Sequence, residues 1–122
     1  MPEPVVLLVE DEDDAREVLA TALEDAHYKV LRAANGAEAL KVLADQTVRC
    51  DLILLDLMMP VMNGWDFRHR QRQDPRLARI PVVLMSAGAR LASTAGGLDA
   101  SGFITKPVEI DDLLNNVKRL CM

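Results

Sequence analysis

Aromatic residues, cysteines and long apolar runs are all scarce in this chain of 122 residues. Only two phenylalanines, one tyrosine and one tryptophan are present although half of the residues are hydrophobic, so aliphatic side chains must fill the core. Two cysteines, Cys50 and Cys121, cannot build the disulfide framework of a small secreted domain. The first apolar run, 5–9, is too short for a signal peptide or a membrane span. These absences predict one cytoplasmic domain over residues 1–122, without membrane contact.

Positive charge is also in short supply, with 14 Lys and Arg against 19 Asp and Glu and a net charge of −5. This balance argues against direct nucleic-acid binding, because phosphate backbones attract dense positive surfaces. The charge is uneven, since acids crowd positions 10–14. Arginines gather in the middle of the chain, at Arg68, Arg70, Arg72, Arg76 and Arg79. We interpret the arginines as a solvated helix face and loop, with a partner-docking surface as the alternative.

Short apolar runs alternate with helix-periodic stretches along the whole chain. Strands are predicted over 5–9, 29–33, 52–55, 82–85 and 102–104. Helices are predicted over 15–26, 36–44, 64–74, 89–98 and 110–120, the fourth weakened by Gly96 and Gly97. This alternation is typical of parallel strands buried on both faces by crossover helices. The sequence therefore predicts an α/β fold, a five-stranded doubly wound sheet with five helices, which binds ligands at the carboxyl ends of its strands.

Chemically active side chains follow four of the predicted strands. Glu10 and Asp11 follow the first strand, Asp56 the third, Ser86 the fourth and Lys106 the fifth. Three carboxylates at one edge repel one another, and a bound cation would remove that cost. Oxygen ligands suit Mg²⁺, which also binds phosphate oxygens. Asp56 can then act as a nucleophile toward a phosphoryl group whose charge Lys106 offsets and whose oxygen Ser86 hydrogen-bonds.

Each of these residues also has a simpler interpretation. Asp11 or Glu12 can cap the first helix, and Asp56 can serve in a turn. A single lysine such as Lys106 is usually solvated, and Ser86 can cap or turn the chain. None of these interpretations explains why the residues follow successive strands.

Five short stretches resemble the receiver domains of two-component response regulators. They are VLLVED at 6–11, ILLDLMMP at 53–60, Asn63-Gly64, VVLMSA at 82–87 and FITKP at 103–107. Their order and spacing make the resemblance specific, and it covers nearly the whole chain. It implies a flavodoxin-like sheet with strand order 2-1-3-4-5.

The resemblance also implies a site and a reaction. Asp56 would take a phosphoryl group from the phosphohistidine of a histidine kinase or phosphotransfer protein and become an aspartylphosphate. Asp11 and Asp56 would bind Mg²⁺ directly, Glu10 mainly through water, and Met58 through its backbone carbonyl. Lys106 would contact the phosphoryl group, with a cis bond to the proline that follows.

By the same resemblance, Ser86 and Phe103 are the switch residues. They would respond to phosphate by repacking the face made by the fourth helix, fifth strand and fifth helix, which meets a downstream output protein or domain. The chain would be a signalling domain that promotes its own phosphorylation and dephosphorylation, not an enzyme. A homodimer is compatible with this interpretation.

Three other functions compete with this one. An aspartate-dependent phosphohydrolase requires a second acid two residues after its nucleophile, where this chain has Met58. A nucleotide- or flavin-binding module requires a glycine-rich phosphate loop after the first strand, where acids stand. A receiver-like interaction module that acts without phosphorylation remains the alternative, because a sequence shows that groups exist and not that they react.

Overall fold

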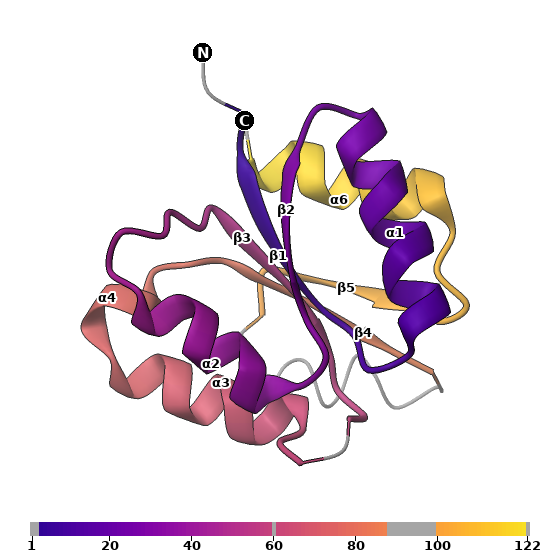
Figure 1. Cartoon of the computed structure of the whole chain (residues 1–122). Coiled ribbons are helices and arrows are strands. Elements are labelled where there is room, and N and C mark those ends of the chain that lie inside the picture. The colour runs from indigo at the N-terminus through magenta and orange to yellow at the C-terminus, as the bar shows by residue number, and fades with distance from the viewer. Residues whose placement is uncertain (1–2, 60, 88–99, 122) are drawn as a thin grey trace.

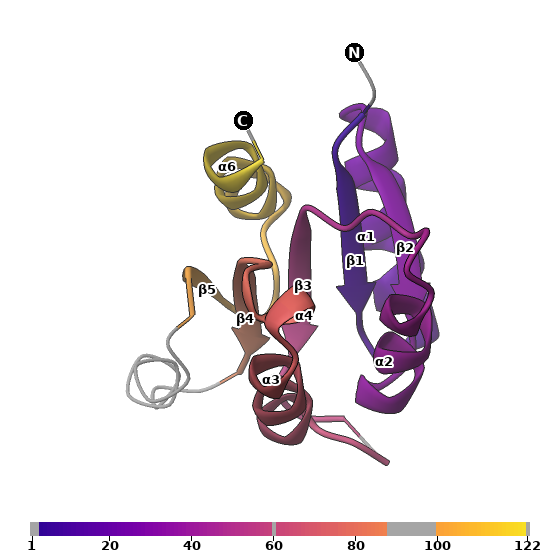
Figure 2. The same ribbon diagram turned by 90° about the vertical axis from the view of Figure 1, so that its left-hand side faces the viewer.

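The computed structural model describes residues 3–59, 61–87 and 100–121, which form a parallel sheet between two layers of helices (Figure 1). The strands are β1 (Val5–Val9), β2 (Lys29–Ala33), β3 (Leu52–Asp56), β4 (Val82–Ser86) and β5 (Gly102–Thr105). Their order is β2-β1-β3-β4-β5, with β2 and β5 at opposite edges (Figure 2). All five predicted strands are confirmed, and β3, β4 and β5 each extend one residue further than predicted.

The described helices are α1 (Asp13–Asp25), α2 (Gly36–Ala44), α3 (Gly64–Gln73), α4 (Pro75–Ala78) and α6 (Ile110–Leu120). The helix predicted over 89–98, with Gly96 and Gly97, lies outside the described residues. We expected α3 to include Asp74, but this residue leaves the helix with extended backbone angles before Pro75. The Asp74 side chain instead accepts a 2.9 Å hydrogen bond from the Arg76 N–H and begins α4, a turn of helix that the sequence did not predict.

Alternate residues of the central strands face two separate apolar layers. Leu7 and Leu55 pack with buried residues of α2 and α3 on one face. Leu8 and Leu54 pack with buried residues of α1 and α6 on the other face. The continuous apolar runs of β1, β3 and β4 follow from this double burial, because neither face of these central strands meets water. Because all five strands are parallel, their carboxyl ends lie at the same edge of the sheet (Figure 2).

Apolar residues of α1, among them Val18, Leu19 and Leu23, recur at three- and four-residue intervals, which predicts that they share one buried stripe. Leu19 and Leu23 are buried as expected, whereas Val18 is 61% exposed. None of the helices described is long and apolar enough to cross a membrane.

Candidate functional site

The carboxyl ends of four strands bring the predicted site residues to one edge of the sheet. Asp56 and Ser86 are the last residues of β3 and β4, while Glu10 directly follows β1 and Lys106 directly follows β5. The strand ends lie close to one another, since Val9 pairs with Leu55, Asp56 with Met85 and Ser86 with Thr105. Residues separated by up to 96 positions in sequence therefore become neighbours.

Lys106 bridges two buried carboxylates. Its Nζ lies 2.9 Å from Glu10 Oε1 and 2.8 Å from Asp56 Oδ2. Glu10 and Asp56 are each only 1% exposed. An open pocket of about 350 Å³, lined in part by Glu10, Lys106 and Pro107, adjoins this ion-pair group. Glu10 and Lys106 therefore border a space that is open to solution, whereas Asp56 does not line this pocket.

Asp11 completes a cluster of three acids whose oxygens are suited to a cation. One carboxylate oxygen from each of Glu10, Asp11 and Asp56 lies within 4.8 Å of the other two. Within the described part of the chain, Glu10 Oε2 is buried without a hydrogen-bond partner. Leaving a buried carboxylate oxygen unpaired is costly, and a bound cation would satisfy it. Because all three donors are hard oxygens, the residues fit Mg²⁺.

The two buried acids have pKa values that are shifted in opposite directions. Burial, followed by the neighbouring Asp56 carboxyl, raises the pKa of Glu10 to about 7. Burial also disfavours the ionised form of Asp56, but the neighbouring Glu10 carboxyl, the Lys106 ammonium and the Met58 N–H outweigh it and lower the pKa of Asp56. Burial likewise opposes the charge on Lys106, and hydrogen bonds to the two acids reverse this and raise its pKa. At neutral pH Asp56 is thus a carboxylate facing an ammonium, and Glu10 holds the proton more readily.

The backbone around Asp56 fixes its side chain. The Met58 N–H donates to Asp56 Oδ1 at 3.1 Å. Helix α3 begins directly against this turn, where the Gly64 N–H donates to the Leu57 carbonyl at 3.1 Å. A Cβ atom at Gly64 would lie 2.8 Å from the Asp56 carbonyl oxygen, so only glycine allows this approach. Asn63 caps α3 by accepting a 2.9 Å bond from the Asp66 N–H, as its residue type favours.

Comparison with known proteins identifies the family. The model of the response regulator receiver domain matches residues 6–118 of this chain. The chain belongs to the response regulator receiver domain family. Receiver domains of two-component response regulators signal through phosphorylation and interact with histidine kinases and output domains.

Individual relatives agree with this assignment. The chain is 34% identical to the DNA-binding dual master transcriptional regulator RpaA of Synechocystis over 96% of its own length and 48% of that protein. It is 37% identical to the two-component response regulator ORR3 of Oryza sativa over 98% of its length and 89% of that protein. The chain spans about half the length of the first curated relatives it matches.

Solved structures of receiver domains have the same fold as this chain. The signal receiver domain of a histidine kinase from Syntrophus aciditrophicus has a TM-score of 0.88 and 34% identity, covering 97% of this chain and 89% of that one. The chemotaxis protein CheY4 of Vibrio cholerae has a TM-score of 0.85 and 29% identity, covering 97% and 98%. The predicted family and the flavodoxin-like fold are therefore confirmed.

The predicted switch residues of the receiver domain lie at and beyond this edge. Ser86 is 8% exposed, and its hydroxyl donates to the Ala87 carbonyl at 3.3 Å. Phe103 on β5 is 49% exposed, so its ring lies outside the core.

Met58 is 67% exposed and contributes its backbone N–H to Asp56. The bond between Lys106 and Pro107 is cis, as predicted.

Sequence reasoning missed three arginines with structural partners. Arg68 was interpreted as part of a solvated face, but it is only 6% exposed and donates to Gln71 Oε1 at 2.8 Å, so that interpretation is wrong for Arg68. Arg76, which is exposed, hydrogen-bonds the Leu43 carbonyl. Arg16 donates to the Glu10 carbonyl beside the site. No pattern in the sequence marks these contacts, because each depends on how separate elements pack.

Proposed function

We propose that this receiver domain, spanning residues 1–122, is a phosphorylation switch in which Asp56 accepts a phosphoryl group from a phosphohistidine. The donor would be a histidine kinase or phosphotransfer protein, and the product an aspartylphosphate. The observation that carries this proposal is the Glu10–Asp56–Lys106 group, in which a buried Glu10 oxygen has no hydrogen-bond partner within the described part of the chain. Such an arrangement suits a nucleophilic carboxylate that works beside a cation.

The proposed metal ligands are the carboxylates of Asp11 and Asp56, the Met58 backbone carbonyl and, mainly through water, Glu10. When bound, Mg²⁺ would offset negative charge on the transferring phosphoryl oxygens. Glu10 would complete the negative field that attracts the ion. The cluster of carboxylate oxygens within 4.8 Å supports this assignment.

The transfer itself is an in-line displacement at phosphorus. An Asp56 oxygen forms the new P–O bond while the P–N bond to the donor imidazole breaks, and its electron pair returns to the imidazole ring. The lowered pKa of Asp56 keeps the nucleophile ionised at neutral pH. The Lys106 ammonium, 2.8 Å from Asp56 Oδ2, would then stabilise the charge on the phosphoryl oxygens. Water later cleaves the aspartylphosphate and regenerates Asp56, so the chain acts as a signalling domain and not as an enzyme on an external substrate.

We further propose that Ser86 and Phe103 convert phosphorylation into a change of surface. The Ser86 hydroxyl now donates to a neighbouring carbonyl, and a phosphoryl oxygen on Asp56 would offer it a charged acceptor. Movement of Ser86 would make room for Phe103, whose ring is half exposed, to turn inward. The output partner would recognise the altered surface of β5 and α6, together with the segment predicted as the fourth helix.

Intact-mass measurement after incubation with a small phosphodonor and Mg²⁺ tests the proposal. The wild-type chain should gain one phosphoryl group, and Asp56→Asn and a metal-free sample should gain none. Asp25→Asn, which alters an exposed acid at the end of α1, is the matched control and should behave as wild type. A wild-type chain that is phosphorylated neither by the small donor nor by kinases would favour the alternative, an interaction module that acts without phosphorylation.

A further inference from the structure

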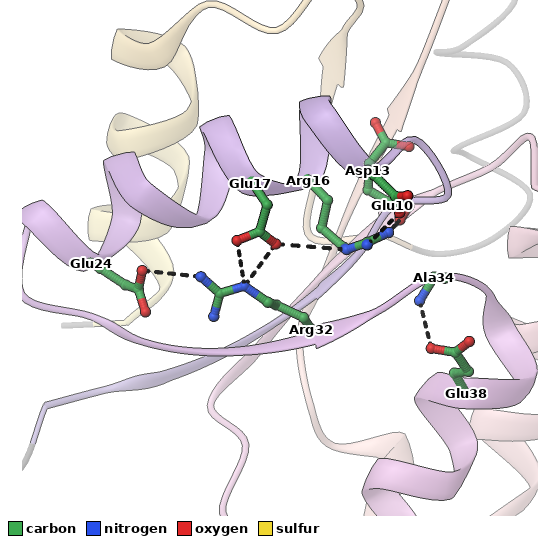
Figure 3. Close-up of polar contacts among 8 residues, drawn as sticks. All are labelled: Glu10, Asp13, Arg16, Glu17, Glu24, Arg32, Ala34 and Glu38. Carbon is green, nitrogen blue, oxygen red and sulfur yellow. Dashed lines mark hydrogen bonds and ion pairs between the residues drawn. The ribbon is translucent and has the colours of Figure 1, made fainter.

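Arg16 in α1 reaches back to the peptide that joins Glu10 to Asp11 (Figure 3). Its Nη1 donates to the Glu10 carbonyl oxygen at 2.9 Å, and its Nη2 donates to Asp13 Oδ1 at 2.6 Å. The side chain is only 16% exposed, although it stands on a surface helix. The guanidinium therefore closes the turn between β1 and α1, which carries two acids of the proposed metal site.

Helix α1, like α6, begins without a side-chain cap. Asn35 and Asn63 accept hydrogen bonds from the first turns of α2 and α3, whereas Glu12 at the N-cap of α1 makes no such bond. The Glu10 N–H donates to the Ala33 carbonyl at the end of β2, at 3.0 Å. Glu10 is thus held at its N–H by β2 and at its carbonyl by Arg16.

A row of alternating charges holds Arg16 in this orientation. Arg16 Nε lies 3.9 Å from Glu17 Oε2, which also lies 3.0 Å from Arg32 Nε. Arg32 in turn pairs with Glu24 at 3.1 Å, so the row links α1 to β2 (Figure 3). Single exposed ion pairs contribute little to stability, but a shared network limits the conformations of its members. The network therefore favours the position of Arg16 that reaches Glu10.

The chemistry of the contact matters as much as its position. The described hydrogen bonds of Arg16 go to a carbonyl and to Asp13, not to the carboxylates of Glu10, Asp11 or Asp56. The ligand oxygens consequently stay available to a cation while the backbone that carries them is held. Outer partners of this kind orient metal ligands, and their loss typically weakens metal binding.

We infer that Arg16 is a positioning residue for the cation site. It fixes the Glu10–Asp11 peptide so that both carboxylates converge on Asp56. This inference rests on the proposed function, because it concerns the Mg²⁺ site proposed there.

Calorimetric titration of the full chain with Mg²⁺ tests the inference. Arg16→Met should raise the Kd for Mg²⁺ about tenfold, within the usual range for outer partners of metal ligands. Arg16→Lys keeps one donor and should lie between Arg16→Met and wild type. Arg32→Met removes the same charge from the same row without touching Glu10, and it should change Kd less than about twofold. In metal-free protein, amide hydrogen exchange at Asp11 should be faster in Arg16→Met than in Arg32→Met.

The outcomes separate the inference from the proposed function. Phosphorylation of Arg16→Met should be slow at limiting Mg²⁺ and recover at saturating Mg²⁺, whereas Arg32→Met should react at nearly the wild-type rate at both concentrations. Equal Kd values for wild type and Arg16→Met, or equal losses in Arg16→Met and Arg32→Met, would overturn the positioning role and leave the proposed function standing. Should Arg16→Met not fold, a wild-type Kd in Arg16→Lys would overturn it instead. A wild-type chain that binds no Mg²⁺ would overturn both.

Discussion

Two groups of buried polar side chains differ in how completely their hydrogen bonds are made. On α3, Gln71 accepts from Arg68 and its amide donates to the Leu77 and Ile80 carbonyls at 2.9 and 3.1 Å. At the strand ends, Lys106 joins two acids of which one, Glu10, retains a buried oxygen without a partner in the described structure. Buried polar groups are normally satisfied, so the exception calls for an explanation.

The difference between the groups indicates their roles. The Arg68–Gln71 group fastens α3 to the turn before β4, and its described bonds are internal to the fold. The Glu10–Asp56–Lys106 group adjoins an open pocket, and among the described residues one Glu10 oxygen has no donor to accept from. A complete network supports a structure, whereas an incomplete one at a strand edge is suited to a ligand.

Replacing Lys106 should produce the largest functional effect. Lys106→Met removes the cation that faces Asp56, and the rate of phosphorylation should fall about 100-fold, as for other losses of a charge-stabilising donor. Intact-mass time courses at saturating Mg²⁺ measure the rate. Lys41→Met on the surface of α2 is the control and should keep the wild-type rate. A wild-type rate in Lys106→Met would contradict the chemical role of the strand-end group, because Lys106 would then not stabilise the phosphoryl charge.

Replacing Gln71 should affect stability and leave the cation site intact. Gln71→Leu leaves the Leu77 and Ile80 carbonyls without their donor and removes a partner of Arg68. We expect this to lower the free energy of unfolding by about 3 kcal/mol. Urea denaturation measures this loss, and Gln73→Ala, at an exposed position on the same helix, should change it by less than about 0.5 kcal/mol. A folded Gln71→Leu chain with weakened Mg²⁺ binding would contradict the separation of the two groups.

The raised pKa of Glu10 predicts a smaller, pH-dependent effect in metal-free protein. The unfolded chain releases this proton near pH 4.5, whereas the folded chain keeps it to about 7. Between these values the folded state binds more protons, so the free energy of unfolding falls as pH rises. Glu10→Gln removes this slope, and above pH 7 it should be more stable than wild type by about 2 kcal/mol. One pKa unit corresponds to about 1.4 kcal/mol, and the opposite shift of Asp56 offsets part of the gain.

Urea unfolding from pH 5 to 8 with a chelator present measures the slope. Glu12→Gln, at an exposed position two residues away, should parallel wild type and serves as the matched control. If the free energy of unfolding depends on pH equally in Glu10→Gln and wild type, the raised pKa of Glu10 is contradicted.

Much of the fold was predictable because the central strands are buried on both faces. Continuous apolar runs such as Val5–Val9 are typical of parallel strands, and a polar residue after the run marks the end of the strand. The sequence alone therefore predicts that the acids, the hydroxyl and the lysine lie at one edge of the sheet. Helix α4 escaped prediction because it is a single turn that depends on the Asp74 cap and on Leu77 packing into the core.

The remaining details depend on contacts between elements that are distant or differently packed. Arg68 looks like its exposed neighbours in sequence, and only the packing of α3 buries it beside Gln71. Val18 looks like a core residue, and only the orientation of α1 exposes it. Side-chain burial follows from the rotation of a helix about its axis, which periodicity specifies only approximately.

By itself, the sequence determined the order of the strands and helices, the family and the identity of the residues at the strand ends, because local patterning and short motifs carry that information. Only the tertiary structure decided that Lys106 joins Glu10 and Asp56, that one Glu10 oxygen has no partner among the described residues, and that Arg16 holds the Glu10 carbonyl. These contacts depend on distances of a few ångströms between separate strands and helices. Such distances are set by packing of the whole core, and no local stretch of sequence specifies them.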